Sequence, residues 1–232
     1  MDILAISLDL DDTLWPIEPA ILRAEERLHV WLSEHCPPVA EAYPVPAMRA
    51  LRERVSEEHP HLAHDFTAQR KISLRTALVP HGYDEDKVEA AFEVFFSARN
   101  DVEVYADTLP ALRRLASKYP LISLTNGNAD LQRIGLHSLF MHTISARELG
   151  IAKPDPAIFL HACERLRVPP AQVLHVGDDP DLDVRGAREA GLRTAWLNRR
   201  GETWSHSVQP DLTFTDLSAL ADWLQVPALA QA

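Results

Sequence analysis

The feature that most constrains the fold is an apolar run near the N-terminus that ends in three acids. The run, Ile-Leu-Ala-Ile-Ser-Leu at residues 3–8, leads directly into Asp9-Leu10-Asp11-Asp12-Thr13. A short segment that is almost entirely apolar predicts a strand buried on both faces, which is typical of a parallel sheet. In open α/β sheets, ligands bind at the carboxyl ends of the strands. We therefore expect the three acids to lie at a binding site.

Asp9 and Asp11 are two residues apart, so in an extended chain both side chains point the same way while Leu10 points into the protein. Two neighbouring carboxylates repel each other unless their charge is offset. Either a cation that prefers oxygen ligands lies between them, Mg²⁺ in particular, or one of them keeps its proton. The alternative is an ordinary polar turn, in which Asp and Thr are common.

The composition indicates a globular protein. Of 232 residues, 46% are hydrophobic and 25% are charged, which are ordinary values, and this length holds one large domain or a core domain with a smaller partner. No apolar run approaches the roughly 18 residues that cross a bilayer, and acids stand where a signal peptide is basic. We therefore expect a cytoplasmic protein.

The formal net charge of −11 argues against nucleic acids and anionic membranes as partners, because both are recognised through basic surfaces. The charge does not exclude a small anionic substrate, since a phosphate ester depends on local positive groups. Cys36 and Cys163 lie far apart without metal-type neighbours, and we expect both to be buried thiols.

Four segments with the apolar spacing of amphipathic helices follow the acidic stretch. They span residues 18–35, 46–59, 62–78 and 84–100, and no strand pattern interrupts them. Pro37 and Pro38 end the first of these helices. The pattern predicts a helical insertion immediately behind the acids, and such a lid can exclude water and select a substrate.

Strands and helices alternate after Asp101. Apolar runs predict strands at 121–125, near 143, at 173–176, at 194–197 and at 212–214, with helices at 108–118, 156–167, 182–190 and 217–224. Strands that alternate with helices of this length imply right-handed crossovers. The fold class is therefore α/β, a Rossmann-like parallel sheet with helices on both faces.

Polar residues also follow two of the later strands. Thr125 and Asn126 end one strand, and Asp178 and Asp179 end another. Between them lies Lys153, which Pro154 and Pro156 place in a stiff loop. A basic group, a hydroxyl and two acidic clusters on neighbouring strand ends are a plausible site for a metal-bound phosphoryl group.

These motifs together resemble the haloacid dehalogenase superfamily of phosphatases. The motifs occur in the family's order, as Asp9-Leu10-Asp11-Asp12-Thr13, Leu124-Thr125-Asn126-Gly127, Lys153-Pro154 and Gly177-Asp178-Asp179-Pro180-Asp181-Leu182-Asp183. The helical insertion is similar to the family's small α-helical cap. The resemblance implies a catalytic core of residues 1–15 and 104–232 and a cap of residues 16–103.

Three further segments resemble a bacterial branch that dephosphorylates flavin mononucleotide and the phosphoribityl-aminouracil intermediate of riboflavin synthesis. They are residues 19–25, 124–129 and 174–179. The resemblance implies Mg²⁺-dependent hydrolysis of a small phosphorylated metabolite. It leaves monomer and homodimer open as the oligomeric state.

The family resemblance implies roles for the acids. Asp9 attacks phosphorus and forms an aspartyl-phosphate, and Asp11 protonates the leaving alkoxide and then takes a proton from the hydrolytic water. This acid role requires an Asp11 that is protonated at working pH. Mg²⁺ is held by Asp9, the backbone carbonyl of Asp11 and Asp178, with Asp179 or Asp183 as further acids.

The resemblance also implies how the phosphoryl group is bound. Thr125 and the Asn126 backbone hydrogen-bond it, and Lys153 neutralises its charge and bridges to Asp9. Trp15 either stacks on a flavin or uracil ring or, as aromatic residues at domain junctions commonly do, packs in the interior.

Three other functions fit parts of this pattern. A haloacid dehalogenase resembles the chain at the nucleophile but lacks an acid two residues later, because halide leaves without a proton, so Asp11 favours phosphate. A sugar-phosphate mutase shares both acids and retains phosphate in its product. A non-catalytic phospholigand-binding module is expected to lose Asp9, Asp11 or Lys153, and all three are present.

Overall fold

The computed structural model of the chain describes residues 2–225. By its internal contacts the chain divides into two compact units. The core unit contains residues 2–16, 103–127 and 135–225, and the helical unit contains Ile17–Val102 and Asn128–Ile134. Among the described residues, no helix has both the length and the hydropathy that crossing a membrane requires.

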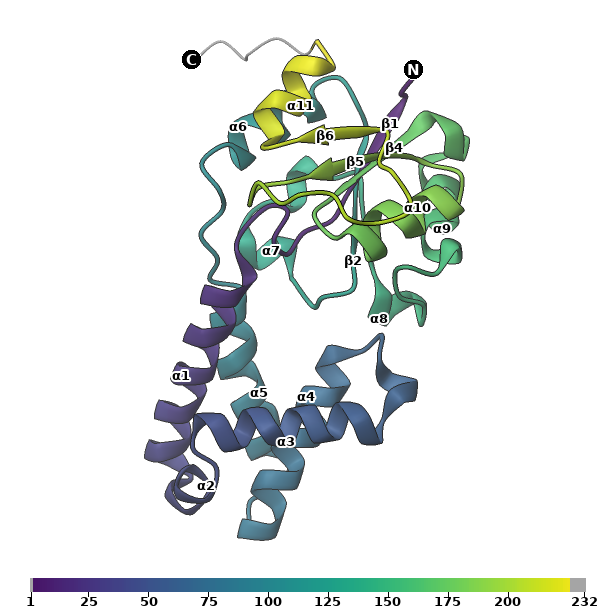
Figure 1. The fold of residues 1–232 in the computed structure, drawn as a ribbon. Coiled ribbons are helices and arrows are strands. Elements are labelled where there is room, and N and C mark those ends of the chain that lie inside the picture. Colours follow the sequence, from purple (N-terminus) through teal and green to yellow (C-terminus); the bar gives the residue numbers. More distant parts are fainter. Residues whose placement is uncertain (1, 226–232) are drawn as a thin grey trace. The chain divides into compact units, whose positions relative to one another are not determined.

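The core unit is built on one sheet of six strands that are all parallel (Figure 1). Its order is β3-β2-β1-β4-β5-β6. The strands are β1 (Ala5–Leu8), β2 (Leu121–Thr125), β3 (His142–Ser145), β4 (Val173–Gly177), β5 (Arg193–Leu197) and β6 (Leu212–Phe214). The predicted α/β class and parallel sheet are confirmed, and the strand that precedes the acids is central, with β2 and β4 on either side.

Helices connect these strands and cover the sheet on both faces (Figure 1). Side chains of α9 and α10 join those of β1, β2 and β4 in one apolar cluster, and α6 packs against α11. Burial on both faces explains the nearly continuous apolar runs of the strands. The helices are α6 (Thr108–Ala116), α8 (Ala146–Leu149), α9 (Pro156–Leu166), α10 (Gly186–Glu189) and α11 (Leu217–Trp223).

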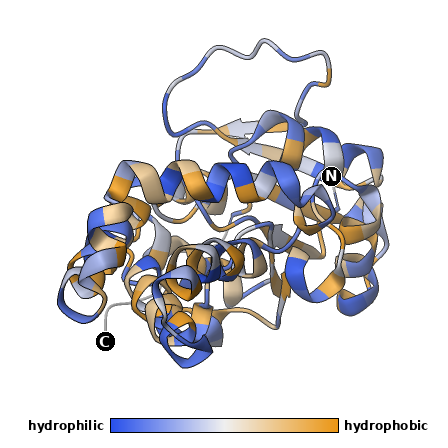
Figure 2. Ribbon diagram, turned by 90° about the horizontal axis from the view of Figure 1, so that it is seen from below, coloured by the Kyte–Doolittle hydropathy of each residue, from blue (hydrophilic) through white to orange (hydrophobic). Residues whose placement is uncertain are grey.

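The helical unit buries its own apolar cluster, to which α1 to α5 all contribute. Figure 2 shows hydrophobic and hydrophilic residues alternating along the helices, as the amphipathic patterns predict. Its helices are α1 (Ile17–His35), α2 (Pro37–Ala42), α3 (Val45–Glu58), α4 (Phe66–Leu78), α5 (Glu85–Arg99) and α7 (Leu131–Ile134). A helical segment does follow β1, as the sequence predicts.

One predicted helix boundary is wrong, and the short helix α2 was not predicted, both for local reasons. The predicted helix at 62–78 begins later, at Phe66, because the Asp65 carboxylate accepts a hydrogen bond from the Ala68 N–H and caps the helix there. Pro37 and Pro38 end α1 but also begin α2, since the first turn of a helix tolerates proline.

A third difference lies close to the acids after β4. The predicted helix at 182–190 is a π-helical segment, Pro180–Arg185, followed by the short α10. Asp179 begins this segment, because its carboxylate accepts hydrogen bonds from the N–H groups of Asp181 and Leu182. Wide helical turns of this kind occur frequently at functional sites.

Candidate active site

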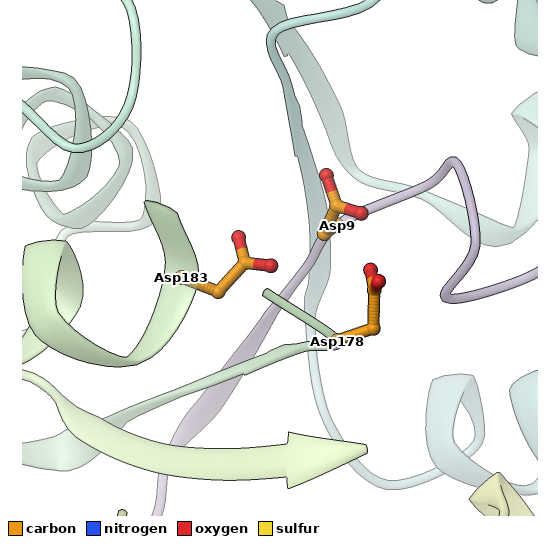
Figure 3. Close-up of side chains that lie close together, drawn as sticks. All are labelled: Asp9, Asp178 and Asp183. Carbon is orange, nitrogen blue, oxygen red and sulfur yellow. The ribbon is translucent and has the colours of Figure 1, made fainter. Parts of the chain in front are cut away.

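Three carboxylates meet at the carboxyl ends of β1 and β4 in the core unit (Figure 3). Asp9 follows β1, Asp178 follows β4, and Asp183 lies on the π-helical segment, with one oxygen of each within 4.8 Å of the others. The sheet explains the meeting, because Leu8 is paired with Val176 and the Asp9 N–H donates to the Val176 carbonyl at 2.9 Å. Asp9 and Asp178, the first residues after β1 and β4, therefore emerge at the same edge of the sheet.

Lys153 supplies the positive charge of this group. Its buried Nζ lies 2.5 Å from Oδ1 of Asp9 and 2.6 Å from Oδ1 of Asp183. Burial alone would lower the pKa of Lys153, but the two carboxylates raise it above its usual value. The ammonium is therefore charged and shared between two acids.

The loop that carries Lys153 is held by Asn126. The Asn126 side chain accepts a hydrogen bond from the Lys153 N–H at 2.8 Å and donates one to the Lys153 carbonyl at 2.9 Å. The predicted involvement of Asn126 through its backbone stays a prediction. The structure gives its side chain the separate task of orienting Lys153.

Asp183 has hydrogen-bond donors on both oxygens. Besides Lys153, Nε2 of His175 lies 3.0 Å from Oδ1, and the Asp179 N–H donates to Oδ2 at 3.1 Å. Although burial would raise the pKa of Asp183, Lys153 and His175 lower it, so the carboxylate stays ionised. Asp183 therefore anchors Lys153.

His175 and Gly177 are two residues of β4 to which the sequence reasoning assigned no role. Burial lowers the pKa of His175, so its neutral ring donates from Nε2 to Asp183, while Nδ1 lies 3.0 Å from the Ser7 hydroxyl on β1. A Cβ atom at Gly177 would lie 2.2 Å from Cγ of Asp183, so only glycine lets this carboxylate approach. The available signal was a pair of polar residues, Ser7 and His175, at paired positions of two otherwise apolar strands.

The carboxylates of Asp9 and Asp178 carry more negative charge than the neighbouring hydrogen-bond donors offset. The buried Thr13 hydroxyl lies 3.1 Å from Oδ2 of Asp9 and 3.0 Å from Oδ1 of Asp178, but its single hydrogen serves one oxygen at a time. Burial, with Asp183 and Asp178 nearby, raises the pKa of Asp9 despite Lys153. Burial, with Asp183 nearby, raises the pKa of Asp178 to about 7.

This donor set fits a divalent cation that prefers oxygen ligands. A cation beside Asp9 and Asp178 would offset the repulsion that raises both pKa values. Asp183 lies within the same cluster but is already occupied by Lys153 and His175. Asp9 and Asp178 have fewer donors than Asp183, so theirs are the carboxylates of this cluster that a cation would stabilise most.

Asp11, two residues after Asp9 in the sequence, is held by Trp15. The indole N–H of Trp15 donates a hydrogen bond to Oδ1 of Asp11 at 2.8 Å, and the Asp12 N–H donates to the Trp15 carbonyl at 2.8 Å. The Trp15 ring is fully buried. These contacts agree with the packing alternative for Trp15 and give its side chain a second task, the orientation of Asp11.

The remaining predicted residues lie at the same edge of the sheet. Thr125 ends β2, and its buried hydroxyl accepts a hydrogen bond from the Gly127 N–H at 2.9 Å. Asp179 is half-buried and uses Oδ1 to cap the π-helical segment. A cavity of about 170 Å³ opens beside Asp178 and is lined by Asp12, Tyr105, Asp179, Trp196 and Arg199, among others.

The chain is similar to several known proteins. A sequence model of the haloacid dehalogenase-like hydrolases matches residues 3–191. The chain is 32% identical over 224 residues to the 5-amino-6-(5-phospho-D-ribitylamino)uracil phosphatase YigB of Escherichia coli, across 93% of this chain and 94% of that protein. It is 33% identical over 236 residues to the phosphoserine phosphatase of Thermus thermophilus, across 90% of this chain and 94% of that protein.

A solved structure shares the whole fold. The crystal structure of the 2-haloacid dehalogenase from Pseudomonas syringae pv. Tomato DC3000 superposes with a TM-score of 0.89 at 40% sequence identity. The match covers 96% of this chain and 98% of that one.

Proposed function

We propose that this chain, which belongs to the haloacid dehalogenase-like hydrolase family, hydrolyses small phosphomonoesters with Asp9 as the nucleophile. Membership of the family makes the chain a hydrolase. The observation that carries the proposal is the placement of Asp9, whose carboxylate contacts the charged Lys153 and lies in one cluster with Asp178. A carboxylate in such a position can attack phosphorus where the charge of the phosphoryl oxygens is offset.

The reaction has two steps. In the first, an Asp9 oxygen forms a bond to phosphorus, the bond to the ester oxygen breaks, and Asp11 gives its proton to the leaving alkoxide. In the second, Asp11 takes a proton from water as the water attacks phosphorus, and the bond between Asp9 and phosphorus breaks. Free phosphate leaves, and both carboxyl groups return to their starting states.

The other groups bind and orient the phosphoryl group. Lys153 faces Asp9 and neutralises charge on the transferring group, while Thr125 and the Asn126 backbone donate hydrogen bonds to it. The hydrogen bond from Trp15 keeps Asp11 at one position while it moves its proton. This positioning lowers the entropy cost of both proton transfers.

We propose Mg²⁺ as the cation of the site. Asp9, Asp178 and the backbone carbonyl of Asp11 would hold it, and the shortage of hydrogen-bond donors around Asp9 and Asp178 supports this assignment. When bound, such an ion draws charge from phosphoryl oxygens and so favours attack. Asp183 would act indirectly through Lys153, and Asp179 through the hydrogen bond from its N–H to Asp183.

The substrate proposal rests on the Escherichia coli relative. That protein is named for a phosphoribityl-aminouracil phosphate, and the match extends over nearly both chains. We propose flavin mononucleotide or the phosphoribityl-aminouracil intermediate as substrate. We also propose that residues 16–103, which contain α1 to α5, form the cap that selects it, and that residues 1–15 and 104–232 form the catalytic core.

Dehalogenation is the second candidate, and the name of the Pseudomonas syringae structure favours it. The presence of Asp11, fixed by Trp15, supports phosphate transfer instead. An alkoxide must receive a proton as it leaves, whereas a halide leaves without one.

The test is product release from a panel of substrates. Flavin mononucleotide, phosphoserine, sugar phosphates and 2-chloropropionate would be assayed for free phosphate or chloride, with and without Mg²⁺. We expect Mg²⁺-dependent phosphate release that Asp9→Asn lowers by at least about a thousandfold, as for other nucleophile removals. Asp86→Asn, at an exposed position on α5, is the matched control and should retain full activity.

Three results would contradict the proposal. Turnover that needs no metal, or that survives in Asp9→Asn, removes the mechanism. Chloride release without phosphate release assigns the chain to dehalogenases. Phosphate that stays on a sugar product assigns it to mutases.

A further inference from the structure

We infer that Arg199 is a positioning residue for the divalent cation, because its guanidinium fixes the backbone of Thr13, whose hydroxyl lies within hydrogen-bond distance of both Asp9 and Asp178. This inference rests on the proposed function. It assigns a task to a residue that lies 186 positions from Thr13 in the sequence and outside the four motifs.

Arg199 follows β5 and reaches back to the loop behind β1. Its Nε donates a hydrogen bond to the Thr13 carbonyl at 2.9 Å. Its two terminal nitrogens donate to the two carboxylate oxygens of Asp107, at 2.9 and 3.1 Å. The guanidinium carbon lies 4.0 Å from the centre of the Tyr105 ring. These groups all belong to the core unit.

Asp107 is itself fixed, which makes the contact a rigid one. It precedes α6, and its Oδ2 also accepts a hydrogen bond from the Leu217 N–H at the start of α11 at 2.8 Å. Burial would raise the pKa of Asp107, but the hydrogen bonds from Arg199 and Leu217 lower it below its usual value. The two parallel hydrogen bonds from Arg199 to Asp107, here called the fork, therefore link Thr13 to two helices of the core unit.

The next residue of the loop is fixed to the same helix. The Leu14 carbonyl accepts hydrogen bonds from the Thr108 hydroxyl at 2.9 Å and from the Tyr105 N–H at 3.1 Å. Consecutive carbonyls, of Thr13 and Leu14, are thus held by groups around the start of α6. The loop cannot shift at Thr13 unless the contact with Arg199 breaks.

The position of Thr13 affects the orientation of the Asp9 and Asp178 carboxylates, while the pairing of β1 with β4 sets their main-chain separation. Its hydroxyl lies within 3.1 Å of one oxygen of each, and these are the two carboxylates assigned to the cation. Groups that orient the ligands of a metal commonly change its affinity about 10- to 100-fold when they are removed. We assign Arg199 an indirect effect on this affinity, which it exerts by holding Thr13.

Lysine cannot replace arginine in this arrangement. The planar guanidinium makes three hydrogen bonds in fixed directions and stacks on an aromatic face, whereas a lysine ammonium is a single point charge. Arg199→Lys keeps the charge of the residue and removes the geometry. It therefore separates the proposed task from a general electrostatic effect.

The experiment is an Mg²⁺ titration followed by thermal unfolding, which measures affinity without turnover. We expect the Mg²⁺ dissociation constant of Arg199→Lys to be about tenfold above that of the wild type. Arg114→Lys is the matched control, because Arg114 also ties α6 to α11, through Asp222 at 2.7 Å, and its side chain is equally buried. Its Mg²⁺ affinity should equal that of the wild type.

The hydrolysis of para-nitrophenyl phosphate gives a second readout. Activity of Arg199→Lys should recover at high Mg²⁺, with an unchanged KM for the ester. If Arg199→Lys does not fold, Asp107→Asn weakens the same fork with little change in shape, and a smaller rise in the Mg²⁺ dissociation constant is expected.

The outcomes separate the inference from the proposed function. A wild type that Mg²⁺ stabilises, with Arg199→Lys and Asp107→Asn stabilised at the same concentrations, overturns the inference alone. A wild type that does not respond to Mg²⁺ overturns both. A lowered Tm with unchanged Mg²⁺ affinity means that Arg199 has only a structural task, and it also overturns the inference.

Discussion

Both units bury charged side chains, but the surroundings shift the pKa of the buried group in opposite directions. In the core unit, Lys153 lies against Asp9 and Asp183, and its pKa is raised. In the helical unit, Arg70 is equally buried, yet its guanidinium lies 3.7 Å over the Phe95 ring, and burial lowers its pKa to about 9. The partners therefore decide the sign of the pKa shift.

The two units also differ in how completely their buried charged groups are hydrogen-bonded. Asp183 accepts hydrogen bonds on both oxygens. In the helical unit, by contrast, Nη1 of Arg70 and Oε1 of Glu25 are buried without a hydrogen-bond partner among the residues that the structure describes. Donors on both oxygens hold the Asp183 carboxylate in one arrangement, and Asp183 in turn positions Lys153.

The largest effect should come from removing the shared cation of the core unit. Lys153→Met leaves Asp9 and Asp183 buried side by side without their ammonium, and breaking a buried ion pair in this way costs about 3–5 kcal/mol of unfolding free energy. Lys71→Met is the control in the helical unit, because its pair with Glu89 is largely exposed and such pairs contribute about 0–1 kcal/mol. Urea unfolding measures both, and equal losses would contradict the contrast.

A smaller loss of stability is expected from glycine substitutions, which distinguish the cost of close packing in the core unit from that of backbone strain in the helical unit. Gly177→Ala forces Asp183 aside, and overpacking of this kind costs about 1–3 kcal/mol. Gly82→Ala in the helical unit meets nothing within 4 Å but has a φ of +86°, which costs about 1–2 kcal/mol. We expect comparable losses of stability, with phosphate release impaired only in Gly177→Ala. Normal activity in that variant would mean that Asp183 can move without consequence.

The smallest effect is the pH dependence of the metal-free protein. Asp178 has a pKa of about 7 in the folded state, above the usual 3.8, so between these values the folded state keeps a proton that the unfolded state has released. Its contribution to stability is complete below about pH 4 and is lost as the pH rises towards 7. We expect the Tm without metal to fall by a few degrees from pH 5 to pH 8.

The same pKa predicts how Mg²⁺ acts. A cation binds the ionised carboxylates, so the gain in Tm on adding Mg²⁺ should be larger at pH 8 than at pH 5. Asp178→Asn, which cannot titrate, should remove most of this difference. A gain that is equal at both pH values would contradict the placement of the cation beside Asp178.

The sequence predicted those parts of the site that come directly after a strand. Asp9, Thr125 and Asp178 each follow an apolar run, and parallel strands carry the residues after them to one edge of the sheet. The sheet and the helical insertion could also be predicted, because both depend on local periodicity. The roles of these residues remain proposals.

Other features depend on pairings that local sequence does not contain. His175 meets Asp183 only because a π-helical segment turns back over β4, and Arg199 meets Thr13 across 186 positions of sequence. The start of α4 depends on a cap at Asp65 that competes with the preceding apolar pattern. Such contacts follow from register and side-chain direction, which periodicity leaves open.

The pairing of β1 with β4 has a consequence for how this enzyme can change. Adjacent parallel strands are kept about 4.8 Å apart by their backbone hydrogen bonds, so the separation of Asp9 from Asp178 is determined by main-chain atoms common to all amino acids. Substitutions elsewhere can alter which molecule is accepted and leave this spacing intact. New substrate preferences are therefore accessible by mutation without rebuilding the reaction centre.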